Sequence, residues 1–435
     1  MPGIIRIKGE RTLTAQQLRK GRLDVTALRS RFPSLSRVTA DGHPVAYLDG
    51  PGGTQVPESV IEAMSSYLRS ANSNIEGEYE LSVETDRIIE RARSMAGVFV
   101  GGDPDCIAFG QNMTTLNFNL SRAMGRTLRP GDEIITTALD HEANVSPWLL
   151  LAQDRDLVVR QVGLREDLAL DMDDLRAKLS DRTRVVAFSL TSNAVGTLTP
   201  AREISDLAHS VGALAWVDAV AYAAHRRIDV AAMGCDVLLC SPYKFFGPHL
   251  GMAWMRRDLA ESLPAERVRP AGQEPPGHRF ETGTLSHEAI AGFIAAVEYL
   301  ASLGAGDDLR LALDTAYQAI EDHETELAHH FMRQFTGLNG VRIAGVASPD
   351  AERRVGTFGI AVDGMEPAAV ARALGRAGVY TWNGSFYAQS IMEHLGMDVE
   401  RGLLRAGMVH YNTTQDIDRF ICELDRLVTS GTSAV

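Results

Sequence analysis

The chain has 435 residues, enough for about two or three domains. Hydrophobic residues make up 45% and charged residues 23%, which excludes a disordered or fibrous protein. The net charge of −13 argues against a general nucleic-acid surface, and no apolar run reaches the roughly 18 residues of a membrane span. The four scattered cysteines favour neither a disulfide framework nor a structural zinc site. Without a recognisable secretory signal, we expect a cytoplasmic protein.

The predicted elements follow a clear order. Residues 1–45 form a mildly basic arm that ends in a turn. Short apolar stretches then alternate with amphipathic ones up to about residue 260. The expected strands are 106–109, 133–137, 157–161, 184–190, 213–217 and 237–240, and the helices between them include 114–125, 173–179 and 201–211. Strands separated by helices in this way predict a mostly parallel sheet that is covered on both faces.

The pattern changes after about residue 290. Long helical stretches at 288–303 and 308–336 precede short strands at 341–343 and 356–362 and helices at 366–377 and 414–429. We therefore predict an α/β fold with an N-terminal arm (1–45), a large domain (46–290) and a smaller α+β C-terminal domain (291–435).

Ligands of such sheets bind beyond the carboxyl ends of the strands. Asp218 directly follows the strand 213–217, and Lys244 follows the strand 237–240. Burying the charged groups of an acid and a lysine costs free energy, so such residues are expected to be paired or to serve a function. One purpose is to hold pyridoxal phosphate: the lysine forms a Schiff base with the aldehyde, and the acid pairs with the pyridinium nitrogen. The alternative is a structural Asp–Lys ion pair.

Polar residues also follow other predicted strands. Thr114 and Thr115 open a helix whose N-terminus suits a phosphate, although an ordinary N-cap would look the same. His141 could stack on a cofactor ring or be a satisfied polar group. No metal site is expected around it, because adjacent turn residues rarely converge on one ion. Asn193 could bond a ring substituent or simply stabilise a turn.

Two later residues have similar double interpretations. Thr284 lies in a glycine-containing loop and is either a phosphate contact or part of a turn. Arg405 lies where a small domain could face the sheet edge, and its guanidinium could grip a carboxylate at two points. A surface ion pair would explain that arginine equally well.

Together these strings resemble the fold-type I pyridoxal-phosphate enzymes of aminotransferase class V, the cysteine desulfurase superfamily, from about residue 45 to 413. The segments YLDGPGGTQVP (47–57), CSPYKFFGPH (240–249) and FETGT (280–284) are similar to its cysteine desulfurase-like subfamily. This resemblance implies a large domain with a mostly parallel seven-stranded sheet and a homodimer with active sites at the interface.

The resemblance also implies residue roles. Lys244 would hold the cofactor and move protons at the substrate Cα, Asp218 would pair with the ring nitrogen, and His141 would stack on the ring. Asn193 would touch the ring oxygen or the substrate carboxylate, which Arg405 would bind. The implied phosphate ligands are Thr114, Thr115, Ser241 and, from the partner subunit, Thr284.

Departures from the family pattern lie at the substrate end. Desulfurases of this family carry a nucleophilic cysteine in a Gly-His-His-Cys-Ala-Gln string, whereas residues 384–389 read Gly-Ser-Phe-Tyr-Ala-Gln, so that Tyr387 replaces the thiol. Trp382 replaces a second, carboxylate-side arginine. Tyr243 replaces the histidine before the lysine and could donate to phosphate or act as an acid or base. Ala221 removes one partner of the ring oxygen.

The predicted function is therefore a pyridoxal-phosphate lyase that eliminates a thiol from a cysteine S-conjugate, because such a reaction needs no enzyme thiol. The alternatives are a decarboxylation-dependent oxidative deaminase, in which Trp382, Phe386 and Tyr387 would shield the site, an epimerase, and an aminotransferase. Less favoured are a sulfurtransferase that uses Cys240 and a non-catalytic binding protein. We expect a small amino-acid substrate and neither nucleic acid nor membrane as partner.

Overall fold

The structure is a computed structural model that describes residues 23–269 and 272–429. The first 22 residues of the predicted basic arm lie outside this part. Among the described residues, no helix combines the length and the apolar character needed to cross a membrane.

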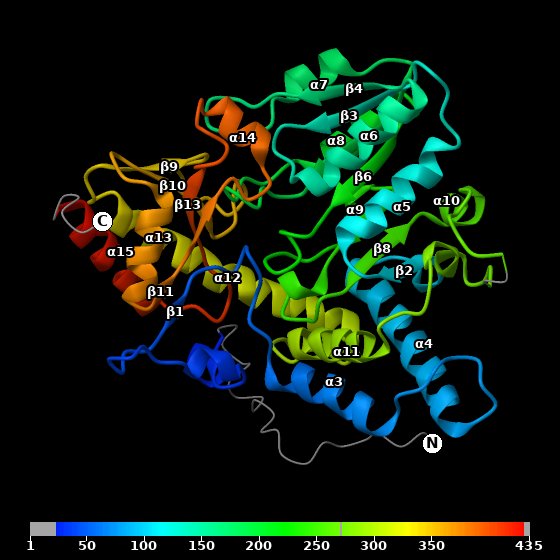
Figure 1. Cartoon of the computed structure of the whole chain (residues 1–435), viewed down its shortest axis with the longest axis horizontal. Coiled ribbons are helices and arrows are strands. Elements are labelled where there is room, and N and C mark those ends of the chain that lie inside the picture. Colours follow the sequence, from blue (N-terminus) through cyan, green and yellow to red (C-terminus); the bar gives the residue numbers. More distant parts are fainter. Residues whose placement is uncertain (1–22, 270–271, 430–435) are drawn as a thin grey trace.

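A seven-stranded sheet forms the centre of the large domain, with the order β2-β8-β7-β6-β5-β3-β4 (Figure 1). The strands are β2 (Ile107–Gly110), β3 (Glu133–Thr137), β4 (Val158–Val162), β5 (Thr183–Ser189), β6 (Leu214–Asp218), β7 (Val237–Cys240) and β8 (Gly251–Met255). The mostly parallel sheet is confirmed, since β3 to β7 run parallel to their neighbours within the sheet. The exception is β8, a strand missing from the prediction, which pairs antiparallel with β2 and β7.

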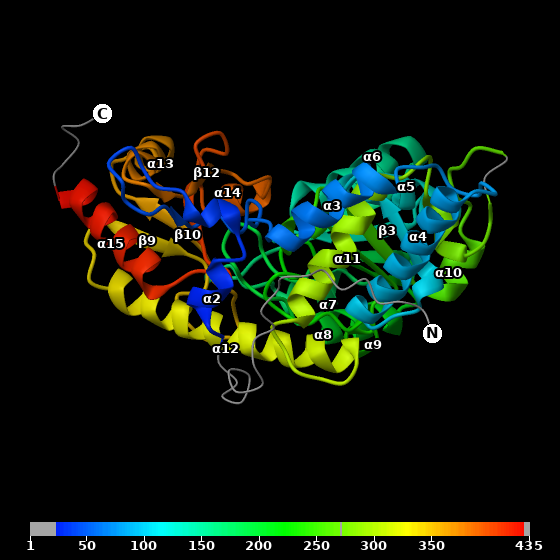
Figure 2. The same cartoon turned by 90° about the horizontal axis from the view of Figure 1, so that it is seen from below.

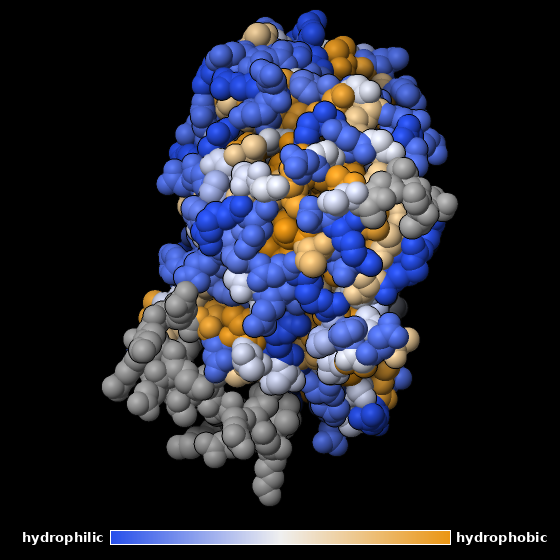
Figure 3. Space-filling view, turned by 90° about the vertical axis from the view of Figure 1, so that its left-hand side faces the viewer, coloured by the Kyte–Doolittle hydropathy of each residue, from blue (hydrophilic) through white to orange (hydrophobic). Residues whose placement is uncertain are grey.

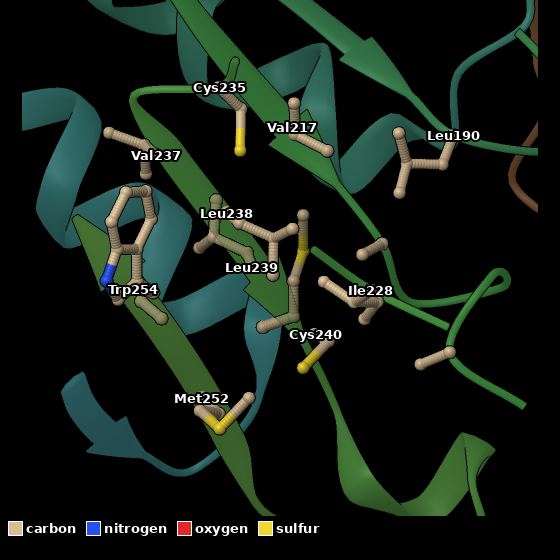
Figure 4. Packing of buried hydrophobic residues seen from close by; sticks show 14 of the residues in the cluster. Leu190, Val217, Ile228, Cys235, Val237, Leu238, Leu239, Cys240, Met252 and Trp254 are labelled. Atoms are coloured by element: carbon tan, nitrogen blue, oxygen red, sulfur yellow. The ribbon is translucent and has the colours of Figure 1, made fainter. Parts of the chain in front are cut away.

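The inner strands of the sheet are buried on both faces, as their apolar residues require, whereas the edge strand β4 is partly exposed. All but one residue of β5 are buried. Figure 4 shows the neighbouring core, where Leu239 and Cys240 of β7 lie near Met252 of β8 and Ile228. The surrounding helices are α3 (Glu58–Ser70), α4 (Glu80–Val100), α5 (Met113–Gly125), α6 (Ser146–Arg155), α7 (Met172–Lys178), α8 (Ala201–Ser210), α9 (Val230–Met233), α10 (Arg257–Ser262) and α11 (His287–Ala301).

The smaller domain contains a four-stranded antiparallel sheet with the order β12-β13-β10-β9. Its strands are β9 (Val341–Ala344), β10 (Thr357–Val362), β12 (Trp382–Gly384) and β13 (Leu403–Gly407), and its helices are α13 (Pro367–Arg376), α14 (Gln389–His394) and α15 (Thr414–Thr429). An early strand joins this domain, because β1 (Ala46–Tyr47) pairs parallel with β11 (Val379–Tyr380). Figure 3 shows the small-domain end of the molecule, where hydrophilic residues cover most of the surface around a band of hydrophobic ones.

One helix connects the two cores. The first half of α12 (Leu309–Phe335) contributes Leu313 and Ile320 to the cluster around the large sheet. Its second half contributes Leu327 and Phe331 to the cluster of the small domain (Figures 1 and 2). Helix α11 also packs in the large cluster. Along α12 the packing therefore passes from the large cluster to that of the small domain.

Candidate active site

A pocket lies at the carboxyl ends of β3, β5, β6 and β7, where the sequence predicted one. It brings together a subset of the predicted site residues, namely Thr114, His141, Asn193, Asp218, Ser241, Tyr243 and Lys244. Thr115, Thr284, Trp382, Tyr387 and Arg405 are not among the residues that line it.

Lys244 ends a short 3-10 turn (Pro242–Lys244) directly after β7. Its Nζ donates hydrogen bonds to the carbonyl oxygens of Gly52, at 3.0 Å, and of Pro51. Burial, together with the positive charge of Arg405, lowers the pKa of Lys244 to about 7. The amine is therefore largely neutral just above neutral pH, which suits a nucleophile that must attack an aldehyde.

Asp218 is the last residue of β6 and is buried. Burial raises its pKa to about 7, although the Val220 N–H donates a 2.8 Å hydrogen bond to Oδ1. A carboxylate that is this costly to ionise gains strongly from a cationic partner, such as a pyridinium nitrogen. Among the described residues no ion pair joins Asp218 to Lys244, so the simple ion-pair interpretation is not observed.

The turn after β3 presents His141 to the pocket. The buried carboxylate of Asp140 shapes this turn, because it accepts hydrogen bonds from Ser189 Oγ at 2.6 Å, from Asn144 Nδ2 at 2.9 Å and from Thr137. His141 Nδ1 accepts from the Ala143 N–H at 3.0 Å. Burial and the charges of Lys244 and Arg405 lower the pKa of His141 to about 4. The ring is therefore neutral, as stacking on a cofactor requires. In the described ranges no cluster of three metal-ligating side chains exists.

The N-terminus of α5 forms one end of the pocket. Asn112, not a threonine, is the N-cap: its Oδ1 accepts from the Thr115 N–H at 2.8 Å and from Thr115 Oγ1 at 3.1 Å. Ser241 Oγ lies next to it and accepts from the Met113 N–H at 3.0 Å. Thr114 faces the pocket, whereas Thr115 and Thr284 line a separate hollow.

Arg405 on β13 is buried beside the pocket rather than exposed. Its Nη2 pairs with Asp49 Oδ1 at 2.9 Å, and its Nη1 donates to the Asn193 carbonyl at 3.0 Å. The guanidinium carbon lies 4.4 Å from the ring centre of Phe386. Sequence reasoning did not assign a role to Asp49, which is 356 residues from Arg405 in the chain, and did not place Phe386 against the arginine. The one sequence signal for Asp49 was its place in the segment YLDGPGGTQVP (47–57), which resembles the family.

The loop that carries Tyr387 is tied to two strand ends of the large domain. Asn193 Nδ2 donates to the Phe386 carbonyl at 2.7 Å, and the Glu142 N–H donates to the Tyr387 carbonyl at 2.8 Å. Phe386 and Tyr387 have φ values of +57° and +56°, a conformation that is unfavourable for side chains of this size. The Tyr387 ring centre is 5.3 Å from that of His141, while 68% of Tyr387 is exposed.

A wider groove adjoins the pocket. Tyr243 lines both, and its ring stacks on His249 at 5.1 Å. Lys244 Nζ lies 4.9 Å from the Tyr243 ring centre. Exposed apolar side chains of α3 face this groove together with Trp382, which is 56% exposed. Trp382 is therefore a groove residue and not part of the lining around Lys244.

None of the four cysteines reaches the pocket. Cys106, Cys235 and Cys240 are buried, and Cys422 is exposed on α15 of the small domain. Cys240 packs between apolar side chains (Figure 4), and burial raises the pKa of its thiol far above the usual value. A thiol in this state is neither ionised nor accessible.

Comparison with known proteins identifies the family. The family model described as aminotransferase class-V matches residues 46–420, so the chain belongs to this family. The chain is 31% identical to "Probable cysteine desulfurase 2" of Mycobacterium leprae, over 92% of this chain and 95% of that one. It is 30% identical to "Aminotransferase-like protein FGM3" of Gibberella zeae, over 92% and 98%. A solved structure of the cysteine desulfurase from Thermococcus onnurineus has the same fold, with a TM-score of 0.83, 24% identity and coverage of 93% and 98%.

Members of this family use pyridoxal 5′-phosphate, and the protein is an enzyme of this cofactor-dependent family. The residues present fit the cofactor. Lys244 offers a neutral amine and Asp218 a buried acid, and Asn193 Oδ1 is buried in the same lining without a hydrogen-bond partner in the described chain. An unpartnered buried acceptor is costly, and a ligand that donates to it would remove that cost.

Proposed function

We propose that the enzyme is a lyase that cleaves the carbon–sulfur bond of a cysteine S-conjugate and does not form a persulfide. The proposal is supported by residues 384–389, which read Gly-Ser-Phe-Tyr-Ala-Gln where the resemblance places the Gly-His-His-Cys-Ala-Gln string of a desulfurase, and by the pocket lining, which in the described chain includes no cysteine. A phenol cannot accept sulfur as a persulfide. In β-elimination the sulfur leaves with its own substituent, so that no enzyme thiol is required.

The cofactor, when bound, supplies an electron sink for the bond electrons of the substrate Cα. Lys244 would hold it and would then take the proton from Cα, which a neutral amine can do. Asp218 would keep the ring nitrogen protonated, and His141 would cover the ring face. Arg405 would bind and orient the substrate carboxylate, together with an N–H of the Asn193 amide.

In the proposed reaction the Cα–H and Cβ–S bonds break and the sulfur leaves with its electron pair. Burial raises the pKa of Tyr243, so its phenol is protonated and can supply the proton that the departing sulfur takes up. Water then hydrolyses the remaining three-carbon fragment to pyruvate and ammonia. No oxidant enters this balance.

The phosphate group would lie at the N-terminus of α5, between Thr114 and Ser241. Thr115 and Thr284 line a neighbouring hollow of the same chain. We propose that Thr284 completes the phosphate site of a partner subunit, so that the functional unit is a homodimer.

The main alternative, decarboxylation followed by oxidation, would favour an aromatic shield over the site. Phe386 is buried against Arg405, but Trp382 and Tyr387 are 56% and 68% exposed. This exposure makes the shield incomplete in the single chain and favours elimination. Epimerisation and amino transfer would use the same cofactor-binding residues, so these reactions are distinguished from elimination by the products they form.

The experiment uses the purified holoenzyme with S-methyl- and S-benzyl-L-cysteine under air and under argon. Equal amounts of thiol and pyruvate, the same under both gases and without hydrogen peroxide, support elimination. Hydrogen peroxide that appears only under air would show that the enzyme catalyses the oxidative reaction and not elimination. Alanine and persulfide from free L-cysteine would overturn the proposal, and a colourless protein that stays inert with added cofactor would indicate a non-catalytic relative.

A further inference from the structure

An acid in the turn after β1 holds the arginine of the substrate end. Asp49 and Arg405 are both buried and form a 2.9 Å ion pair. The Asn193 carbonyl accepts from the other terminal nitrogen, and Phe386 covers the guanidinium plane. Nε of Arg405 has no hydrogen-bond partner within the described chain. Two of the five N–H groups of the guanidinium are thus engaged and its plane is covered by Phe386, while Nε is buried without a partner in the described chain.

Backbone pairing sets the position of Asp49 relative to Arg405. Asp49 forms a parallel bridge with Gly407 at the end of β13. The Gly407 N–H donates to the Leu48 carbonyl at 2.7 Å, and the Gly50 N–H donates to the Gly407 carbonyl at 3.3 Å. Arg405 lies on the same strand as Gly407, so its distance to Asp49 is fixed by the main chain and not only by two flexible side chains.

The same turn reaches Lys244. The carbonyls of Pro51 and Gly52 accept from its amine, and a Cβ at Gly52 would lie 2.3 Å from Oδ2 of Asp49. Asp49 also lines the groove that adjoins the pocket. The Asp49 carboxylate therefore borders the groove, and its charge also acts on the Lys244 amine.

We propose that Asp49 is a positioning residue for Arg405, which it orients so that the unused N–H groups of the guanidinium meet the carboxylate of the substrate. The proposal rests on the proposed function only in taking an L-amino acid as the ligand. Asp49 acts through Arg405, and it therefore favours amino acids over amines of the same shape that lack the carboxylate.

The test compares holoenzyme binding of S-methyl-L-cysteine and of S-methylcysteamine, its analogue without the carboxylate, through the change in cofactor absorbance. We expect Asp49→Asn to raise the Kd of the amino acid about tenfold or more, with the Kd of the amine unchanged. The melting temperature should fall, because the buried guanidinium loses its anionic partner. Arg405→Lys should have the same selective effect. In the double variant the two effects should not add, because both act on one contact.

Two further variants keep the result interpretable. Asp416→Asn removes a comparable 2.9 Å pair with Arg29 and should leave both Kd values unchanged. Gly52→Ala displaces the Asp49 carboxylate without removing its charge and should reproduce the selective loss. The proposal is overturned by an unchanged or lower Kd of the amino acid in Asp49→Asn, by equal losses for both ligands, or by additive effects with Arg405→Lys.

The outcome is separable from that of the proposed function. L-Alanine and ethylamine form a second ligand pair that has no sulfur to eliminate. If the wild type releases no thiol from any S-conjugate but Asp49→Asn binds L-alanine selectively more weakly, the lyase proposal fails and the positioning role of Asp49 stands.

Discussion

The cofactor end and the substrate end of the pocket are built in different ways. The cofactor end uses residues that directly follow strands of one sheet, as His141 follows β3 and Asp218 follows β6. The substrate end combines the turn after β1, the loop after β12 and a residue of β13, which lie far apart in the chain. By the resemblance to the family, Tyr387 and Trp382 at the second end would take the places of a cysteine and an arginine. One sheet edge can serve different reactions when the segments facing it change.

The largest expected effect comes from Lys244→Ala, which removes the one amine among the described residues that line the pocket. Turnover should fall by about a thousandfold or more, and the absorbance of covalently held cofactor should disappear. Thiol release and absorbance spectra measure both. Lys178→Ala is the matched control, because Lys178 pairs with Asp174 on α7. A Lys244→Ala variant with a tenth of the activity would contradict the assignment of the cofactor end.

Asp218→Asn should come next, with a fall in turnover of about a hundredfold, because an amide cannot hold the ring nitrogen protonated. Cofactor should remain attached through Lys244, so that its absorbance band persists. Rates and spectra of the same sample separate this loss from a loss of cofactor. Wild-type turnover in this variant would remove Asp218 from the mechanism.

The pH dependence of cofactor attachment should show the lowered pKa of Lys244. Only the neutral amine attacks the aldehyde, so below pH 7 the attachment rate to apoprotein should fall about tenfold for each pH unit. Above about pH 8 it should level off. Stopped-flow absorbance follows the reaction, and repeating it with Asp218→Asn isolates the neighbouring acid. A rate that keeps rising to about pH 10 would mean that the lysine has its ordinary pKa.

The smallest effect is expected at the cysteines. Cys240→Ala should leave turnover within about twofold, because its buried thiol takes no part in the reaction. Alkylation of the exposed Cys422 should likewise spare activity. If the Cys240 variant or the alkylated protein lost turnover but kept its cofactor, the result would support the sulfurtransferase alternative. A cysteine would then take part in the reaction at the substrate end.

This contrast also explains what the sequence could predict. Asp218 and Lys244 were found because each follows an apolar strand, and strand ends are visible in the local pattern. The ion pair between Asp49 and Arg405 joins residues that are 356 positions apart in the chain. The stacking of Phe386 on that arginine is likewise a tertiary contact, between a loop and a strand. No local periodicity encodes such contacts. Strand β8 was missed for a related reason, since only its antiparallel neighbours define it.

Helix α12 has a mechanical consequence for substrate entry. Its 27 residues span about 40 Å as one continuous rod. Each half of α12 is packed into one of the two hydrophobic clusters. A hinge motion between the two domains would therefore have to bend the helix or remove its side chains from one cluster. Admission and release are therefore expected to depend on local movements of exposed side chains beside the groove, such as Trp382, while the two domains keep a constant separation.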